Sequence, residues 1–172
     1  MTEIWDASHV RQVLASQAPD IDVVFFEAST ATSQLAAEQI GCELGQIAKS
    51  IVFWVVDKPV VVVTSGDQRV DDRKLALYFD VPRKRIRTAN AEECIAVTGY
   101  APGGVPPLAH RRDDITLFVD ASLARFSRIF AAAGASNAIM PLTVDRLLSL
   151  TGGMLIDMAK SAETGSPPES GA

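Results

Sequence analysis

The chain of 172 residues is 48% hydrophobic, which is enough apolar material to build one compact domain with a buried core. Its 16 Lys and Arg residues face 21 Asp and Glu residues, so the formal net charge is −5. This acidic balance argues against broad, non-specific binding of nucleic acid, although it permits a local basic patch.

Cysteine and histidine usage argues against the common disulfide and zinc frameworks. Cys42 and Cys94 form no CxxC pair, which is typical of proteins in a reducing cytoplasm. His9 and His110 are the only histidines, so the sequence predicts no zinc site. The first ten residues contain acids and no apolar core, and we expect neither a signal peptide nor a membrane anchor there.

Residues up to about 41 predict two helices and one strand. Ser8 can cap the first helix and Thr32 or Ser33 the second, because short polar side chains accept hydrogen bonds from free amides at a helix start. The β-branched and aromatic residues of IDVVFFE are typical of a strand. The predicted elements are a helix over 9–17, a strand over 21–27 and a helix over 34–41.

The two longest apolar runs, IVFWVV and PVVVV, are separated by charged residues at 57–58. They are too short to span a bilayer and predict an antiparallel hairpin. Strand alternation then places Lys49, Ile51, Phe53 and Val55 on one face. A lysine on such a face either extends its ammonium into water or binds a ligand, and the strand taken alone favours the first.

The second half of the chain predicts further short strands and helices around a long loop. Asn90 and Glu93 form a capping-box variant, so we interpret the acids at 92–93 as helix capping. The predicted elements are a turn over 65–68, helices over 71–79, 91–99 and 144–152, and strands over 84–89, 115–120, 127–134 and 137–143. Their order lacks regular βαβ alternation and predicts an α+β fold with a mixed, partly closed, barrel-like sheet surrounded by short helices. We expect one domain over 1–160 and a disordered tail over 161–172.

Two segments outside these elements can carry binding chemistry. In the loop APGGVPP over 101–107, the prolines are rigid and lack N–H groups, so the free donors expected are the successive amides of Gly103, Gly104 and Val105. These three amides can form an anion-binding nest; a stiff surface turn is the alternative. The run over 83–87 holds Arg83, Lys84, Arg85 and Arg87 and is either a tRNA-binding patch or a solvated face. No GxSxG, P-loop or GxGxxG motif occurs, so a conventional triad or nucleotide site is not supported.

These pieces together resemble a known family. The motifs TATSQLAAEQIG, GQIAKSIVF, VVTSGDQRVD, GYAPGGVPPLAH, LFVDASL and LLSLTGG occur in the order and spacing seen in the YbaK family of aminoacyl-tRNA editing domains. That family includes the insertion domain of bacterial prolyl-tRNA synthetases and its free-standing relatives. The resemblance runs from about residue 29 to residue 160, which is nearly the whole folded part.

The resemblance implies an aminoacyl-tRNA deacylase that hydrolyses, in trans, the ester between a wrong amino acid and tRNA. The tRNA is usually the one for proline, and alanine, serine and cysteine are all open as the amino acid removed. The resemblance implies a YbaK-like fold, an essential lysine at Lys49 and a GxxxP loop from Gly103 to Pro107. A cation at Lys49 can hold a phosphate or ribose of the 3′ end, while the loop amides face the developing oxyanion. A ribose hydroxyl or the substrate amine then orients the water, so no protein base is required.

The candidate site residues follow from these motifs. The catalytic set is Lys49, Gly103, Gly104, Val105 and Pro107. The substrate-binding set is Thr32, Ile51, Phe53, Ser65, Gly66, His110 and Asp120. Related chains often read Gly-His where this chain has Ala109-His110, so the part played by His110 is open.

The partners implied are the acceptor end of misacylated tRNA and, further, prolyl-tRNA synthetase or an elongation factor, with no membrane, no DNA and no cofactor. The expected location is the cytoplasm. A non-catalytic paralogue that binds tRNA or a synthetase as a regulator is the alternative function, and a small-molecule or nucleotide-binding module is a third.

Overall fold

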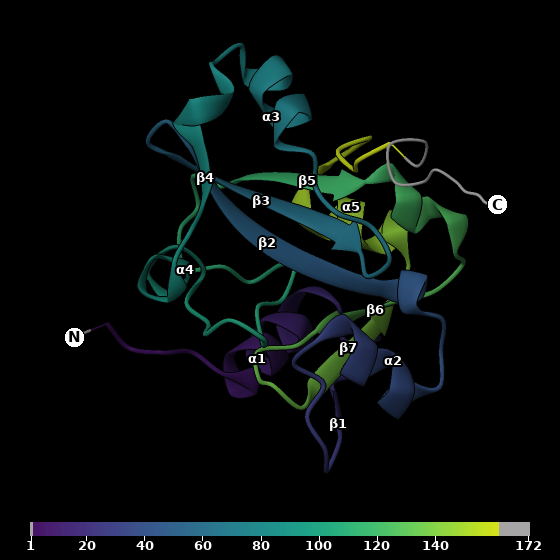
Figure 1. Cartoon of the computed structure of the whole chain (residues 1–172). Helices are drawn as coiled ribbons and strands as arrows, with labels where there is room; N and C mark the ends of the chain where they lie inside the picture. Colours follow the sequence, from purple (N-terminus) through teal and green to yellow (C-terminus); the bar gives the residue numbers. More distant parts are fainter. Residues whose placement is uncertain (1, 162–172) are drawn as a thin grey trace, which may run out of the picture.

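The computed structural model describes residues 2–161 and contains five α-helices around an eight-stranded sheet (Figure 1). The helices are α1 (Ala7–Gln17), α2 (Ser33–Ile40), α3 (Asp72–Phe79), α4 (Ala91–Thr98) and α5 (Val144–Thr151). The strands are β1 (Val24–Phe25), β2 (Ile47–Val55), β3 (Lys58–Ser65), β4 (Ile86–Thr88), β5 (Thr116–Asp120), β6 (Ile129–Ala132), β7 (Ala138–Leu142) and β8 (Met154–Ile156). Three short 3₁₀ turns are η1 (Leu44–Gln46), η2 (Arg83–Arg85) and η3 (Ala121–Arg125).

The sheet is mixed, which confirms the predicted α+β class. Its order is β1-β7-β6-β2-β3-β5-β8, and β4 pairs with β2 outside this path. The β2–β6, β3–β5 and β5–β8 pairs are parallel, whereas the other pairs are antiparallel. Within residues 2–161 the two end strands β1 and β8 do not pair, so the sheet is not closed.

The predicted hairpin is confirmed and forms the centre of the sheet. Eight residue pairs join β2 to β3, from Ala48 opposite Ser65 to Val55 opposite Lys58. Along β3, Val61 and Val63 pack into the core cluster that contains residues of α1, α4 and α5. Val60 and Val62 pack on the other side, with residues of α3. Because strand side chains alternate between faces, the continuous valine run fills two cores at once.

One edge of β2 is interrupted between its pairings with β6 and β4. On this edge β2 pairs with β6 at Ile47 and Ala48, and with β4 from Phe53 to Val55. The carbonyl of Val52 accepts a hydrogen bond from the amide of Ala89 at 2.9 Å. In the described part of the chain, residues 49–51 therefore have no strand neighbour on this edge. A gap of this kind leaves room for loops and for a ligand.

Some local expectations need correction. The first helix is capped by Asp6, whose carboxylate accepts from the amide of Ser8, so Ser8 is not the cap. Thr32 caps α2 and Asn90 caps α4 with a capping box, as predicted. The strand expected over 21–27 shrinks to β1, and the strand expected over 84–89 begins only at Ile86, after η2. β8 was not predicted from the sequence.

The predicted domain boundaries at 1 and 160 stay a prediction. Of the tail expected over 161–172, all but residue 161 lies outside the described residues. Each helix within residues 2–161 is too short or too polar to cross a lipid bilayer.

Candidate functional site

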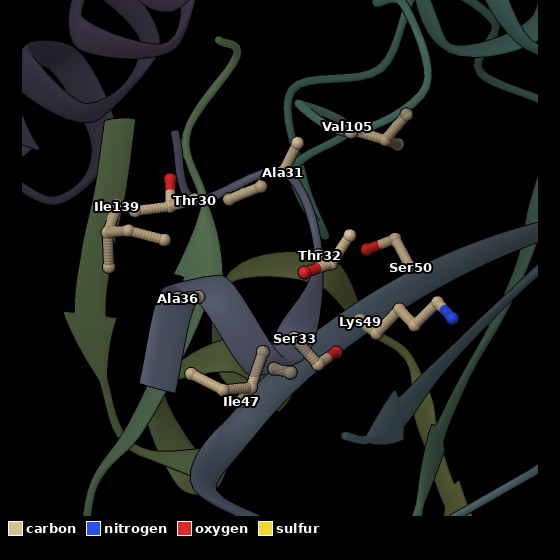
Figure 2. Close-up of a pocket in the computed structure, with 13 residues that line it drawn as sticks. Thr30, Ala31, Thr32, Ser33, Ala36, Ile47, Lys49, Ser50, Val105 and Ile139 are labelled. Carbon is tan, nitrogen blue, oxygen red and sulfur yellow. The ribbon is translucent and has the colours of Figure 1, made fainter. Parts of the chain in front are cut away.

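A small cavity lies at the interrupted edge of β2, with a volume of about 100 Å³. We call it the pocket. One side is lined by Thr32, Lys49, Ser50 and the loop residue Val105, and the apolar end by Ala36 and Ile139 (Figure 2). Gly103 of the same loop also lines the pocket. Among residues 2–161, Lys49 is the only ionisable side chain that lines it. The pocket can therefore hold a small, largely apolar group beside one cation.

One wall of the pocket is the segment that leads into α2. The amide of Thr30 donates to the carbonyl of Ser136 at 2.7 Å, which ties this segment to the turn between β6 and β7. The hydroxyl of Thr32 accepts from the amide of Leu35 at 3.1 Å and so begins the helix. Helix capping by Thr32 and the hydrogen bond from Thr30 to Ser136 thus fix the position of Thr32, which lines the same pocket as Lys49.

The opposite wall is the predicted GxxxP loop, which docks on the same turn. The carbonyl of Gly104 accepts from the amide of Gly134 at 2.9 Å. A side chain at Gly104 would meet the backbone of Ala135 at 2.9 to 3.0 Å, so glycine permits this close approach. One turn therefore holds both walls of the pocket in place.

Two of the three amides expected to be free are free. The amide of Gly104 donates to the carbonyl of Ala101 at 3.2 Å, so the expectation of a third free donor is wrong at this position. The N–H groups of Gly103 and Val105 have no hydrogen-bond acceptor within residues 2–161. Gly103 has a φ of 93°, a left-handed conformation that favours glycine. Both free donors belong to residues that line the pocket.

Ser50 is a pocket residue that the sequence reasoning missed. Its hydroxyl is buried and has no hydrogen-bond partner within residues 2–161, and Figure 2 shows it directed toward Thr32. An unpaired buried hydroxyl costs roughly 1 to 3 kcal/mol, so a ligand that bonds to it recovers that free energy. A serine inside an otherwise apolar strand, next to Lys49, was the available indication.

Lys49 stands where the pocket meets a second, larger cavity. Its side chain is exposed and has no hydrogen-bond or ion-pair partner in the described chain, and in Figure 2 its ammonium points away from Ala36 and Ile139. The second cavity, of about 720 Å³, is lined by Lys49 together with Ile51, Phe53 and Gly66. We call it the groove. Lys49 thus shares a face with Ile51 and Phe53, as strand alternation predicts.

Two other predicted site residues lie away from Lys49. His110 and Pro107 line a separate cavity beside α1. Nε2 of His110 donates to the carbonyl of Pro106 at 2.7 Å, and burial lowers the pKa of His110. His110 therefore supports the loop from behind. The preceding Ala109 has a φ of 62°, so the position where related chains often carry glycine is left-handed here.

Ser65 and Asp120 have structural roles as well. The hydroxyl of Ser65 donates to the carbonyl of Gly45 and accepts from Arg125 at 2.9 Å. Asp120 is 1% exposed; its carboxylate caps η3 and accepts from the amide of Met158 at 2.7 Å. Neither residue lines the pocket or the groove.

The basic run over 83–87 is partly neutralised. Arg83 pairs with Asp72 at 2.7 Å. Arg87 donates two hydrogen bonds to Glu93, at 2.8 and 2.7 Å, and this contact lowers the pKa of Glu93 to about 2. Lys84 and Arg85 are exposed and lie outside the groove. Only Arg83 of this run lines the groove with Lys49.

The described residues contain no group of three or more His, Cys, Asp or Glu side chains placed to hold a metal ion. What the pocket offers is one cation, two amide donors and an unpaired hydroxyl around a small cavity. These groups can bind a carbonyl or ester whose oxygen gains negative charge.

The chain is similar to several known proteins. The Aminoacyl-tRNA editing domain matches residues 27–150. YwhH of Bacillus subtilis (strain 168) is 38% identical over 129 residues, which cover 73% of this chain and 78% of that protein. A protein of Enterococcus faecalis (strain ATCC 700802 / V583) named "Putative Cys-tRNA(Pro)/Cys-tRNA(Cys) deacylase EbsC" is 30% identical over 129 residues, covering 74% of this chain and 76% of that one.

One similar solved structure is called "Crystal structure of a putative trans-editing enzyme for prolyl tRNA synthetase". It superposes with a TM-score of 0.83 at 33% identity, over 90% of this chain and 97% of that chain. The likeness in fold therefore extends over nearly the whole described part.

Proposed function

This chain belongs to the aminoacyl-tRNA editing domain family, and from that premise we propose that it is an aminoacyl-tRNA deacylase acting in trans. Its substrate is a tRNA carrying a small, wrong amino acid, with tRNA for proline as the first candidate. The names of EbsC and of the trans-editing structure support this choice, since both refer to proline tRNA or its synthetase. Such chemistry belongs in the cytoplasm, where charged tRNA is found.

The observation that carries the proposal is the pocket itself. Lys49, the free amides of Gly103 and Val105, and the unpaired hydroxyl of Ser50 surround a cavity of only about 100 Å³. A small aminoacyl group fits this volume, whereas a large side chain does not. Selection by size complements a synthetase, which cannot exclude amino acids smaller than its own.

In the proposed mechanism, the ester carbonyl lies against the loop and water attacks its carbon. Negative charge builds on the carbonyl oxygen, and the amides of Gly103 and Val105 donate to it. Preorganised donors of this kind are worth roughly 3 to 4 kcal/mol each in the transition state. The ester C–O bond then breaks and releases the amino acid and the 3′-terminal ribose hydroxyl of the tRNA.

The base in this mechanism comes from the substrate. Because Lys49 is the only ionisable side chain that the described residues place in the pocket, none of their carboxylates or histidines is there to take a proton from water. A vicinal ribose hydroxyl or the amino group of the substrate orients the water and relays one of its protons to the departing ribose oxygen. Lys49 contributes by holding a phosphate or ribose oxygen of the terminal nucleotide with its ammonium.

The test is to incubate the protein with tRNA for proline charged with alanine, serine or cysteine and to follow loss of the ester. We expect faster hydrolysis of at least one of these than of the prolyl ester. If none is hydrolysed while the tRNA still binds, the chain is a non-catalytic tRNA-binding regulator and the proposal is wrong.

A further inference from the structure

The groove lies on the opposite face of β2 from Ser50 and is several times larger than the pocket, at about 720 Å³. Its apolar floor includes Ile51 and Val70, and Lys49 stands at the border with the pocket. Any substrate whose ester lies in the pocket and whose chain passes Lys49 therefore continues into the groove.

The charge of the groove differs from that of the whole chain. Four cations and two carboxylates line it, although the chain carries a net charge of −5. Both carboxylates are already engaged, Asp67 with Arg125 at 2.8 Å and Asp72 with Arg83 at 2.7 Å. The remaining cations are Lys49, Arg69 and Lys160, whose side chains have no hydrogen-bond or ion-pair partner within residues 2–161.

Arg69 and Lys160 are held opposite each other by backbone pairing. Val70 and Ala159 form an antiparallel bridge. On either side of it, the amide of Lys160 donates to the carbonyl of Arg69 and the amide of Asp71 donates to the carbonyl of Met158, both at 2.8 Å. We call this pairing of 69–71 with 158–160 the clasp. Like charges directly opposite each other destabilise a strand pair unless an anion lies between or beside them.

We propose that the groove binds the phosphates of the single-stranded acceptor end of tRNA, with Arg69 and Lys160 as its phosphate ligands; this rests on the proposed function. Lys49 then links the two regions, with the ester on one side and the preceding nucleotides on the other. A chain of phosphates matches three unneutralised cations along an open groove with an apolar floor. The run over 83–87 contributes little to tRNA binding, because its two end residues, Arg83 and Arg87, are already ion-paired.

The experiment compares two double variants with the same change in charge. Arg69→Ala/Lys160→Ala removes two groove cations and leaves the backbone bonds of the clasp in place. Lys84→Ala/Arg85→Ala removes two exposed cations outside the groove. The dissociation constant of uncharged tRNA is measured for each across a series of salt concentrations, with thermal unfolding as a check of the fold.

We expect the groove variant to bind tRNA roughly tenfold more weakly and to lower the salt slope by roughly 1.4, since each single-strand phosphate contact contributes about 0.7. The matched variant should change the slope by less than about 0.3, because neither of its residues contacts a phosphate. An unchanged slope in the groove variant, or a larger change in the matched variant, overturns the proposal.

A minimal substrate separates this inference from the proposed function. An aminoacyl ester of adenosine has no phosphodiester, so the groove variant should hydrolyse it as fast as the unmodified protein while it loses activity on charged tRNA. A loss on both substrates contradicts a role limited to phosphate binding. If the unmodified protein hydrolyses neither substrate, the proposed function fails, while the salt slope still decides whether the groove binds tRNA.

Discussion

The pocket and the groove share Lys49, yet they differ in size, charge and construction. The pocket is small, is closed by two walls fixed to one turn, and contains a buried hydroxyl without a partner. The groove is large, is lined by charged side chains, and depends on the clasp between distant segments. A small, rigid cavity can discriminate between side chains that differ by one or two atoms, whereas an open charged groove binds any chain of phosphates. We infer that recognition of the amino acid and recognition of the tRNA are divided between the two regions.

The largest expected effect comes from Lys49, because it borders both regions. Lys49→Ala should lower kcat/KM for deacylation at least about 100-fold, the order expected for one charged contact in a transition state. Stability should change by less than about 0.5 kcal/mol, since the side chain is exposed and unpaired. Deacylation assays and thermal unfolding measure the two quantities.

Lys49→Arg is the matched control for charge. It should keep the salt dependence of tRNA binding, which Lys49→Ala should lower, but leave turnover low, because a planar guanidinium does not place its charge as a compact ammonium does. Full activity in the alanine variant would remove Lys49 from the site.

The next largest effect is expected at Gly103, in the loop that forms one wall of the pocket. Gly103→Ala should lower turnover about tenfold by displacing the donors, since a new Cβ would lie 3.2 Å from that of Ala31. Gly41→Ala is a matched control: Gly41 also has a left-handed φ, of 78°, but nothing lies within 4 Å of the new Cβ. Both variants should lose about 1 kcal/mol of stability, and only the first should lose activity. Equal activity in the two would show that the loop does not act on the ester.

A smaller change is expected at Ser50, and it has opposite signs for stability and activity. Ser50→Ala removes an unpaired buried hydroxyl and should raise the free energy of unfolding by about 1 kcal/mol. It should lower deacylation about fivefold if the hydroxyl bonds to the aminoacyl group, and leave tRNA affinity unchanged. Thr64→Val, which removes another unpaired buried hydroxyl that lines neither cavity, should gain stability without loss of activity. Unchanged hydrolysis in Ser50→Ala would exclude a contact with the substrate.

The smallest effect is a pH dependence of stability at His110, which supports the pocket's loop from behind. Burial lowers the pKa of His110, so the unfolded chain binds a proton more readily than the folded one, and stability should fall as the pH drops below about 6.5. His110→Gln, which keeps a donor for the carbonyl of Pro106, should lose this slope between pH 7 and 5. Unfolding by denaturant at several pH values measures the free energy of unfolding of the unmodified protein and of His110→Gln. The same slope in both would contradict the assignment of this pH dependence to His110.

Local patterns made much of the fold predictable. The cap at Thr32, the capping box at Asn90 and the β2–β3 hairpin each depend on residues close together in the sequence, and all three are confirmed. The strand β8 was missed because Met154–Ile156 follows α5 closely and is only three residues long. Such a short segment shows no alternation of its own and forms because β5 offers it an edge.

The candidate site was less predictable, because its parts come from distant segments. Strand alternation singled out Lys49 and the prolines and glycines singled out the loop, the family resemblance gave both their roles, and the structure brings them together with Thr32. The sequence shows a dense run at 83–87, but its partners Asp72 and Glu93 become visible only when the fold places them beside it. Arg69 and Lys160 are isolated cations in the sequence, and only the clasp joins them.

The clasp also sets the order in which the protein becomes competent during its synthesis. Lys160 is added ninety-one residues after Arg69, which at a ribosomal rate of about 5 to 20 residues per second is roughly 5 to 20 s later. Until then segment 69–71 lacks its backbone partner and the groove lacks one of its three unpaired cations. The pocket needs residues up to Ile139, so synthesis completes it only twenty-one residues before the groove receives the last of its unpaired cations.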